Sequence, residues 1–146
     1  MAPVDVRVET VIRRPRDAVA AYAAEPDNAA SWYVNIESAE WKTPRPLGVG
    51  SQFAFAAKFL GRELKYTYEV VEFVADQRLV MRTAEGPFPM ETAYEWADVE
   101  PGFTRMTLRN RGEPTGFARF VAPLVAMAMR RANVKDLERL KKILEA

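Results

Sequence analysis

The stretch GFARFVAPLVAMAMRRANVKDLERLKKILEA, residues 116–146, is the longest run of this chain with the residue spacing of an α-helix. Apolar residues recur there at three- and four-residue steps, the period of a helix with one buried side. They form two groups: Phe117, Phe120, Val121, Leu124 and Ala128, and then Val134, Leu137, Leu140 and Leu144. The rest of the chain is interpreted as the surface against which this helix packs.

The two groups do not share one helical face. At about 100° per residue their stripes are out of phase, and Pro123, which lacks a backbone donor, lies within the first. We therefore predict a bend or a restart of the helix between Pro123 and Arg130. The first half, as far as Met127, is expected to face a cavity, and the second half to lock onto a sheet and short helices.

Composition indicates one globular domain over residues 1–146. Hydrophobic residues make up 49% and charged residues 28%, with a net charge of +1 and neither cysteine nor histidine. This balance gives no overall bias toward nucleic acid. It also excludes disulfides, thiolate or imidazole zinc sites, cysteine nucleophiles and Ser/His/Asp triads, so no metal or cofactor is predicted. No run approaches the roughly 18 apolar residues of a membrane span, and a cytoplasmic protein without an integral membrane segment is expected.

The remaining sequence predicts strands interrupted early by two short helices. Residues 4–10 alternate apolar and polar side chains, as a half-buried strand does. Pro15 suits the start of a helix, and a second short helix is predicted from Pro26 to about Trp32. Strands separated by Pro and Gly turns are predicted at residues 36–42, 51–60, 62–73, 78–83, 90–99 and 104–111. No helix-length spacer divides them, so neighbours should pair antiparallel.

Alternation within these strands separates an aromatic sheet face from a charged one. The acidic residues Glu63, Glu69, Glu91 and Glu95 fall on the charged face, where a solvated lattice of cross-strand charges is favoured over paired catalytic carboxylates. In the second strand Glu40 and Trp41 point in opposite directions, and the sequence leaves open which of them lies inside.

Five stretches in this order resemble the polyketide cyclase/dehydrase and lipid-transport-like family of the START and Bet v 1-like (SRPBCC) superfamily. They are VIRRPRDAVAAYAAEPDNAASW at 11–32, LGVGSQF at 47–53, YTYEV at 66–70, GFTRMTL at 102–108 and DLERLKKILE at 136–145. The resemblance implies an α+β helix-grip fold. It comprises a curved antiparallel sheet of about seven strands, two short helices after the first strand, and a long C-terminal helix over a cavity for a hydrophobic molecule. It carries over no catalytic residue.

The predicted cavity lining is the set of large apolar and aromatic side chains on the inner face and the last helix. It comprises Trp32, Phe53, Phe55, Tyr66, Tyr68, Met81, Met90, Tyr94, Trp96, Met106, Leu108, Phe117, Phe120, Leu124 and Met127. The tyrosine hydroxyls would orient a ligand, and the methionines would form an adaptable wall. Arg130 would stand at the cavity mouth, where its charge stays solvated. The same residues could instead be ordinary core, and Arg130 could simply reach solvent.

The function expected from these observations is the binding of a small hydrophobic or aromatic ligand, lipid or polyketide-like, between the sheet and the last helix. One alternative is a cyclase, aromatase or dehydratase in which Tyr66, Tyr68 or Tyr94 donates a proton to a bound carbonyl. Another is a protein-interaction module like the co-chaperone and ribosome-associated relatives in the superfamily. The basic segment MAMRRANVK at 127–135 is interpreted as a solvated helix face rather than a membrane-binding one.

Overall fold

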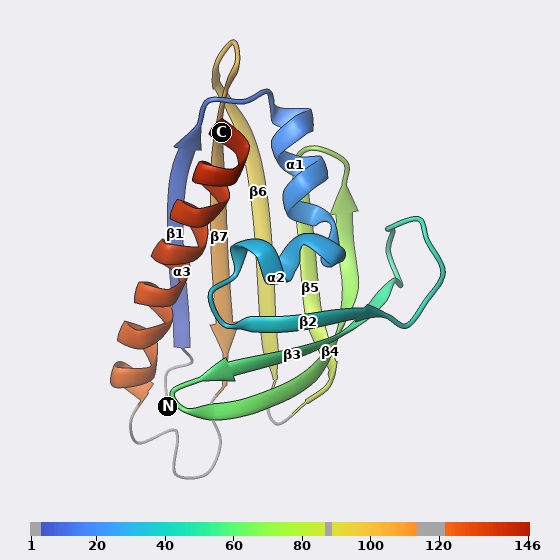
Figure 1. The fold of residues 1–146 in the computed structure, drawn as a ribbon. Helices are drawn as coiled ribbons and strands as arrows, with labels where there is room; N and C mark the ends of the chain where they lie inside the picture. The colour runs from blue at the N-terminus through green and yellow to red at the C-terminus, as the bar shows by residue number, and fades with distance from the viewer. Residues whose placement is uncertain (1–3, 87–88, 114–121) are drawn as a thin grey trace.

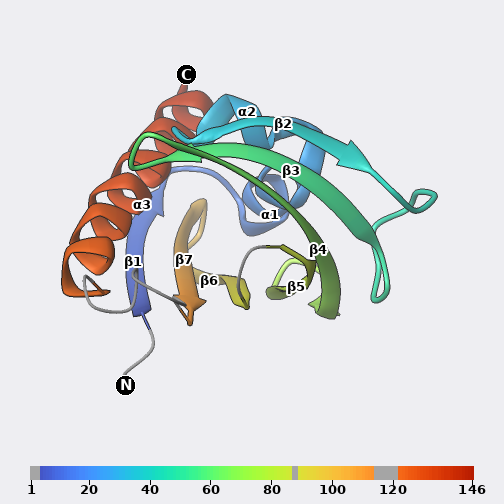
Figure 2. The same cartoon turned by 90° about the horizontal axis from the view of Figure 1, so that it is seen from below.

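A curved sheet of seven antiparallel strands is the frame of the molecule (Figures 1 and 2). The computed structural model describes residues 4–86, 89–113 and 122–146. Its strands are β1 (Val4–Ile12), β2 (Ile36–Trp41), β3 (Gln52–Phe59), β4 (Arg62–Val74), β5 (Arg78–Glu85), β6 (Met90–Glu100) and β7 (Phe103–Gly112). They lie in the order β1-β7-β6-β5-β4-β3-β2, so β1 and β2 are the two edges. The predicted strands and their antiparallel pairing are confirmed.

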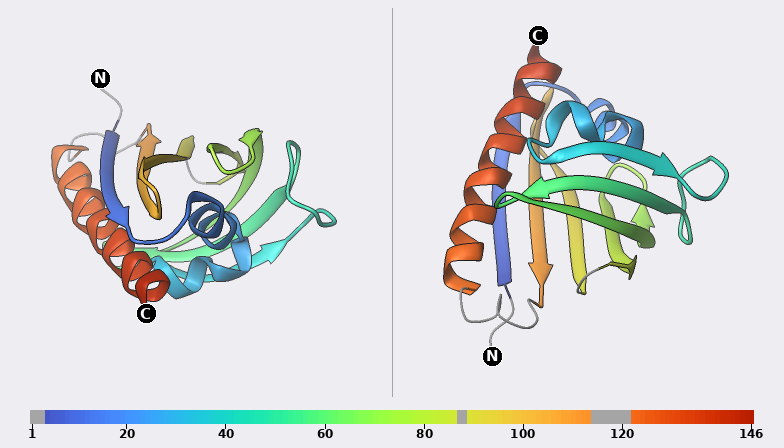
Figure 3. Two further views of the ribbon diagram at one scale, coloured as in Figure 1. Left: turned by 90° about the horizontal axis from the view of Figure 1, so that it is seen from above. Right: turned by 60° about the horizontal axis from the view of Figure 1, so that its bottom comes forward.

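Two helices and a single 3-10 turn connect β1 to β2. They are α1 (Arg16–Ala24), η1 (Pro26–Asn28) and α2 (Ala29–Trp32). Pro15 precedes the first turn of α1 and Pro26 opens η1, where the fixed φ of proline is suitable and its missing N–H breaks no helical bond. Val19, Ala20 and Ala23 are the buried side of α1. Seen from above, α1 lies across the hollow of the sheet (Figure 3).

The inner face of the sheet carries the hydrophobic core, as its alternation predicts. Val4, Val6 and Val8 are buried while Asp5 and Arg7 are exposed, the two-residue period of a strand. Trp41 pairs with Phe53, which is fully buried, so Trp41 faces inward and Glu40 faces solvent. The register between β2 and β3 thus settles the facing that the sequence left open.

The outer face carries cross-strand ion pairs, which confirms the structural interpretation of its carboxylates. The Glu91 carboxylate accepts from Arg111 at 2.7 Å and from Arg82 at 3.2 Å, one on each neighbouring strand. Arg78 lies 3.1 Å from Glu72 and 3.2 Å from Glu95. Each of these carboxylates is held by guanidinium groups on the face away from the core, which makes acid/base catalysis there unsuitable.

The last helix, α3, runs without interruption as Ala122–Glu145. Its start at residue 116 was predicted from residues that lie outside the described ranges. One continuous stripe of α3 faces the core, consisting of Ala122, Val125, Ala126, Met129, Asn133, Leu137, Leu140 and Leu144. The second half therefore packs as predicted through its three leucines.

The predicted break of α3 between Pro123 and Arg130 is wrong for residues 122–145. α3 is continuous from Ala122 to Glu145, and Pro123 interrupts nothing within that range. Leu124, Met127 and Val134 lie on the solvent side, with exposed fractions of 64%, 55% and 42%. The predicted phase break counted Leu124 and Val134 as buried, although exposed apolar residues are common on protein surfaces; Phe117, Phe120 and Val121, on which it also rested, lie outside the described residues.

Basic side chains of α3 bind the free edge of β1. The Arg130 guanidinium donates to the carbonyl oxygen of Arg7 at 3.2 Å, and the Lys141 ammonium donates to that of Val11 at 2.6 Å. Both carbonyls belong to an edge strand, whose unpaired polar groups are otherwise open to other chains. Arg130 therefore has a structural contact on β1.

Candidate ligand-binding site

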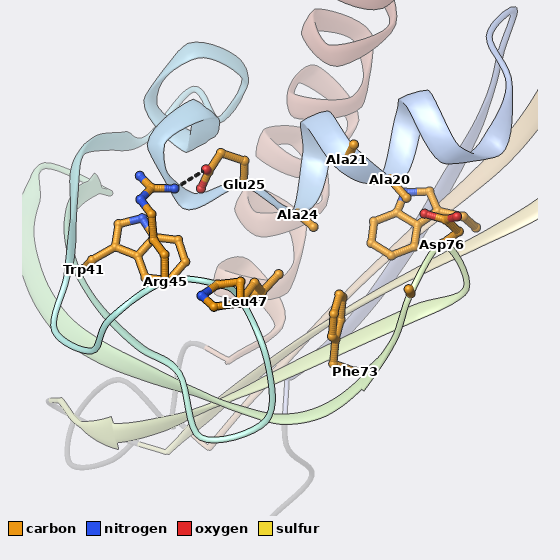
Figure 4. Close-up of a pocket in the computed structure, with 12 residues that line it drawn as sticks. Ala20, Ala21, Ala24, Glu25, Trp41, Arg45, Leu47, Phe73 and Asp76 are labelled. Carbon is orange, nitrogen blue, oxygen red and sulfur yellow. Dashed lines mark hydrogen bonds and ion pairs between the residues drawn. The ribbon is translucent and has the colours of Figure 1, made fainter.

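A cavity of about 310 Å³ lies beneath α1 (Figure 4). Three segments that are far apart in sequence border it and leave it partly open to solvent: α1, the loop that joins β2 to β3, and the turn that joins β4 to β5. Three alanines on α1 have side chains small enough to leave space for the cavity, and large side chains of the sheet and loop form the opposite walls. The apolar lining comprises Ala20, Ala21, Ala24, Trp41, Leu47, Phe73 and Trp96. The volume of this cavity is at the lower end of the range for small-molecule sites.

The loop between β2 and β3 is held against α1 by the side chain of Arg45. Its guanidinium donates to Glu25 Oε1 at 2.7 Å and also bonds to Asp27. The guanidinium carbon lies 4.5 Å from the centroid of the Trp41 ring, a cation–π geometry. The base of the loop is fixed as well, because the Gly48 N–H donates to Ser51 Oγ at 3.0 Å. These contacts close one end of the cavity.

Two of the lining tryptophans carry indole N–H groups without an acceptor. Within the described residues, Nε1 of Trp41 and Nε1 of Trp96 are buried and make no hydrogen bond. Buried donors are nearly always paired in folded proteins, and an unpaired one costs about 1–3 kcal/mol. Nε1 of Trp32, which lies in the core away from the cavity, is buried without a partner in the same way, so this feature is not specific to the cavity.

A row of hydrogen-bonded polar side chains crosses the inner face and ends on α3. The Tyr68 hydroxyl lies 2.8 Å from Thr92 Oγ1, which donates to Asn110 Oδ1 at 2.5 Å. Asn110 Nδ2 donates to Asn133 Oδ1 at 3.0 Å, and Asn133 Nδ2 donates to Asp136 Oδ2 at 3.3 Å. Thr92 has one proton, which it gives to Asn110, so Tyr68 is the donor to Thr92. In every bond of this row, therefore, the donor is the side chain nearer Tyr68 and the acceptor is the one nearer the Asp136 carboxylate.

The phenols of this region are held in their protonated form. Burial raises the pKa of Tyr68 to about 12, and burial also raises the pKa of Tyr94. The Tyr33 and Tyr94 hydroxyl oxygens lie 2.6 Å apart, and burial raises the pKa of Tyr33 too. Because removing a proton would leave a buried phenolate, these groups can donate hydrogen bonds but cannot serve as bases near neutral pH.

Burial also raises the pKa of the Asp136 carboxyl, to about 6. Asp136 is only 1% exposed, and its other oxygen accepts from the Val34 N–H at 2.8 Å. These two hydrogen bonds favour the ionised form, but the loss of water around a buried carboxylate outweighs them. Asp136 is thus a buried acid that joins α3 to the segment before β2.

Residues 3–145 match the family model described as polyketide cyclase/dehydrase and lipid transport. The chain belongs to this family. The match covers all the elements described above and confirms the resemblance read from the sequence.

Solved structures of low sequence identity share the fold of this family member. A Thermus thermophilus protein superimposes with a TM-score of 0.82 at 22% identity, covering 94% of each chain. The Zhui aromatase/cyclase of a Streptomyces species gives 0.81 at 16% identity, covering 99% of this chain and 94% of that one. A START superfamily protein from Mycobacterium smegmatis gives 0.81 at 12%, covering 99% and 98%. None of the curated proteins matches the chain significantly in sequence. The START and Bet v 1-like fold is therefore established.

The part of this family member that the structure describes has no grouping of three or more His, Cys, Asp or Glu side chains placed to hold a metal ion. Within the same ranges, no helix has the length and apolar character needed to cross a membrane.

Most of the predicted lining residues are core side chains rather than walls of the cavity beneath α1. Trp96 borders that cavity, which lies beneath α1 and not, as predicted, between the sheet and the last helix. Other members of the predicted set pack in the core cluster, namely Trp32, Phe53, Phe55, Tyr66, Tyr68, Met81, Met90, Tyr94, Met106 and Leu108. Leu124 and Met127 face solvent on α3, and Arg130 bonds β1 instead of bordering this cavity. Phe117 and Phe120 lie outside the described residues.

Sequence reasoning missed the two features that define the site. Trp41 was left with an undecided facing, and Ala20, Ala21 and Ala24 look like an ordinary small-residue helix. Asn133 and Asp136 lie three residues apart on the stripe that carries Leu137 and Leu140, so the helical period could have placed them inside. They were overlooked because polar residues within a charged helix usually face water.

Proposed function

We propose that this protein binds a small hydrophobic molecule, aromatic, polyketide-like or lipid, in the cavity beneath α1. The observation that carries the proposal is a mainly apolar cavity of about 310 Å³ walled by Trp41, Phe73 and Trp96 and bordered by a few charged side chains. Predominantly apolar and aromatic walls with a small number of polar groups are typical of small-molecule sites. The family, polyketide cyclase/dehydrase and lipid transport, agrees with a ligand of this kind. The proposed site is bounded by α1 and the β2–β3 loop, away from the solvent-facing Leu124 and Met127 of α3.

Filling the cavity from α1 tests this proposal. Ala24 lines the cavity, so Ala24→Leu would occupy space that a ligand needs while keeping a residue that favours helices. We expect at least a tenfold loss of affinity for a neutral aromatic probe, 2-naphthalenemethanol, measured by isothermal titration calorimetry. Filling an empty space usually maintains or raises stability, which a urea denaturation curve of the variant would show.

The matched control is Ala30→Leu, the same change at an exposed residue of α2 that does not border the cavity. Its affinity for 2-naphthalenemethanol should equal that of the unmodified protein. If Ala24→Leu bound the probe as tightly as Ala30→Leu does, the site would have to lie elsewhere. Absence of binding to the unmodified protein by any hydrophobic probe would defeat the proposal itself.

A second function, a cyclase or dehydratase reaction, is favoured by the polar row from Tyr68 to Asp136. Its phenol remains protonated, since burial raises the pKa of Tyr68 to about 12, and a substrate carbonyl that replaced Thr92 as the acceptor of this proton would be polarised by it. On this proposal Tyr68→Phe would lower turnover of a polyketide mimic at least tenfold while binding persists. Unchanged turnover in Tyr68→Phe, or none in the unmodified protein, would leave binding as the function.

A further inference from the structure

The charged groups around the cavity beneath α1 are predominantly acidic. Glu25, Arg45 and Asp76 border it, and Asp27 forms a second ion pair with Arg45. These are three carboxylates and one guanidinium, which leaves a formal charge of minus two around the cavity. Figure 4 shows Glu25, Arg45 and Trp41 at one end of the cavity and Asp76 with Phe73 at the other. An approaching ligand therefore meets negative charge at the Asp76 end.

The carboxylate of Asp76 makes no ion pair with any described residue. Asp76 lies in the turn between β4 and β5 with a φ of 62°, the left-handed region that aspartate and asparagine tolerate better than most residues. Its side chain is half-buried at the cavity. An asparagine would suit the turn equally well, so the turn itself does not require the negative charge.

The one cation at the cavity is already engaged by protein carboxylates. Arg45 bonds to Glu25 at 2.7 Å and to Asp27, and these two bonds raise the pKa of its guanidinium. The same group lies over the Trp41 ring at 4.5 Å. A ligand carboxylate at Arg45 would have to share the guanidinium with Glu25 and Asp27, whose two negative charges exceed its single positive charge. The cavity therefore offers no free positive charge to an anionic ligand within the described residues.

The interior of the cavity is compatible with a positively charged or neutral polar group. Trp41, Phe73 and Trp96 line the cavity, and aromatic rings attract cations through the electron density of their faces, as the Arg45 guanidinium over the Trp41 ring illustrates. A neutral hydroxyl or carbonyl group carries no charge for the surrounding carboxylates to repel, so it is compatible with this lining as well.

We infer that the cavity beneath α1 selects hydrophobic ligands whose polar end is a cation, such as an aromatic amine, or is neutral, and that it discriminates against carboxylates such as free fatty acids. This inference rests on the proposed binding function, and it specifies which charge the ligand carries. Asp76 is the residue that determines the preference, because its unpaired carboxylate would attract a ligand ammonium group and repel a ligand carboxylate.

Three probes with one ring system and different charges test this inference. They are 2-naphthylmethylamine, 2-naphthalenemethanol and 2-naphthoic acid, titrated calorimetrically at neutral pH and low salt. The expected order of affinity is amine, then alcohol, then acid, with at least a tenfold difference between amine and acid, which corresponds to about 1.4 kcal/mol. Asp76→Asn should reduce that difference to less than threefold while leaving the affinity for the alcohol unchanged. Glu63→Gln, which removes an exposed charge outside the cavity lining, should leave the full difference.

The outcomes separate this inference from the function on which it rests. If the acid binds as tightly as the amine and Ala24→Leu still abolishes binding of the alcohol, the cavity binds ligands but the charge selection is wrong. A preference that Asp76→Asn and Glu63→Gln alter equally would also overturn it, since overall charge would then be the cause. If the unmodified protein binds none of the three probes, both proposals fail.

Discussion

Asp136 is the buried acid whose titration should be visible in the stability of the protein. Its pKa is about 6 in the folded state, against an ordinary value of 3.8. The folded protein therefore takes up this proton at a higher pH than the unfolded chain does, so the contribution of Asp136 to stability falls as pH rises from about 4 to 6. The shift of about two pKa units corresponds to roughly 3 kcal/mol.

Asp136→Asn isolates this contribution because it removes the titration. The difference in unfolding free energy between the unmodified protein and the variant should change by up to roughly 3 kcal/mol between pH 7 and pH 4, in favour of the unmodified protein at pH 4. Urea denaturation followed by circular dichroism at half-unit pH steps measures it. Acids with lowered pKa values, such as Asp5 and Glu91, titrate in both proteins and cancel. Parallel pH profiles would contradict the assignment.

The sequence supports few conclusions at this scale. The alternation of side chains correctly predicted that the aromatic rings lie on the inner face, because which residues share a face can be seen within a single strand. It could not show that Tyr68, Thr92, Asn110, Asn133 and Asp136 join in one row, since that row links three strands and a helix. Contacts of this kind depend on strand register, which single-strand patterns do not determine.

At the scale of elements, α3 was correctly predicted to be a helix, but some of the residues assigned to its buried face are exposed. The helix exists because apolar residues recur at helical steps, but Leu124, Met127 and Val134 were counted with the buried side. The buried stripe instead runs through Ala122, Ala126, Met129 and Asn133 to the leucines beyond. Part of the buried face of α3 consists of small and polar residues. A prediction based on hydrophobicity alone does not count such residues as buried.

Two identical substitutions on α3 measure which face is buried. Leu140 is fully buried and Leu124 is 64% exposed. Leu140→Ala should destabilise the protein by about 2–5 kcal/mol, through lost burial and a residual cavity. Leu124→Ala should change stability by about 0.5 kcal/mol or less. The midpoints of urea denaturation compare them directly, and similar losses at both sites would mean that the helix face is misassigned.

At the scale of the whole molecule, the meander from β2 to β7 was predictable, but the pairing of β1 with β7 and the position of the cavity were not. Turn residues and strand alternation lie close together in sequence, so they specify a meander without knowledge of distant contacts. The cavity beneath α1 requires the β2–β3 loop to meet the end of α1, through Arg45 and Glu25. These residues come together only in the folded chain, and each looks like a surface charge in the sequence.

The meeting of α1 and the β2–β3 loop should matter more for ligand binding than for folding. Arg45 lies at the surface, and exposed ion pairs typically stabilise proteins by about 1 kcal/mol or less. Its second role is to hold the loop that walls the cavity, so Arg45→Ala should let that wall move and so weaken binding. We expect about a tenfold loss of affinity for 2-naphthalenemethanol, an uncharged probe that does not respond to the removed charge.

The control is Arg16→Ala, which breaks the exposed ion pair between Arg16 and Asp98, 3.5 Å apart, without touching the cavity lining. Both variants should unfold within about 1 kcal/mol of the unmodified protein, as urea denaturation would show, and only Arg45→Ala should lose affinity in calorimetric titration. An equal affinity in both variants would mean that the loop keeps its position without Arg45. A large loss of stability in Arg45→Ala would instead make the contact between loop and α1 part of the fold itself.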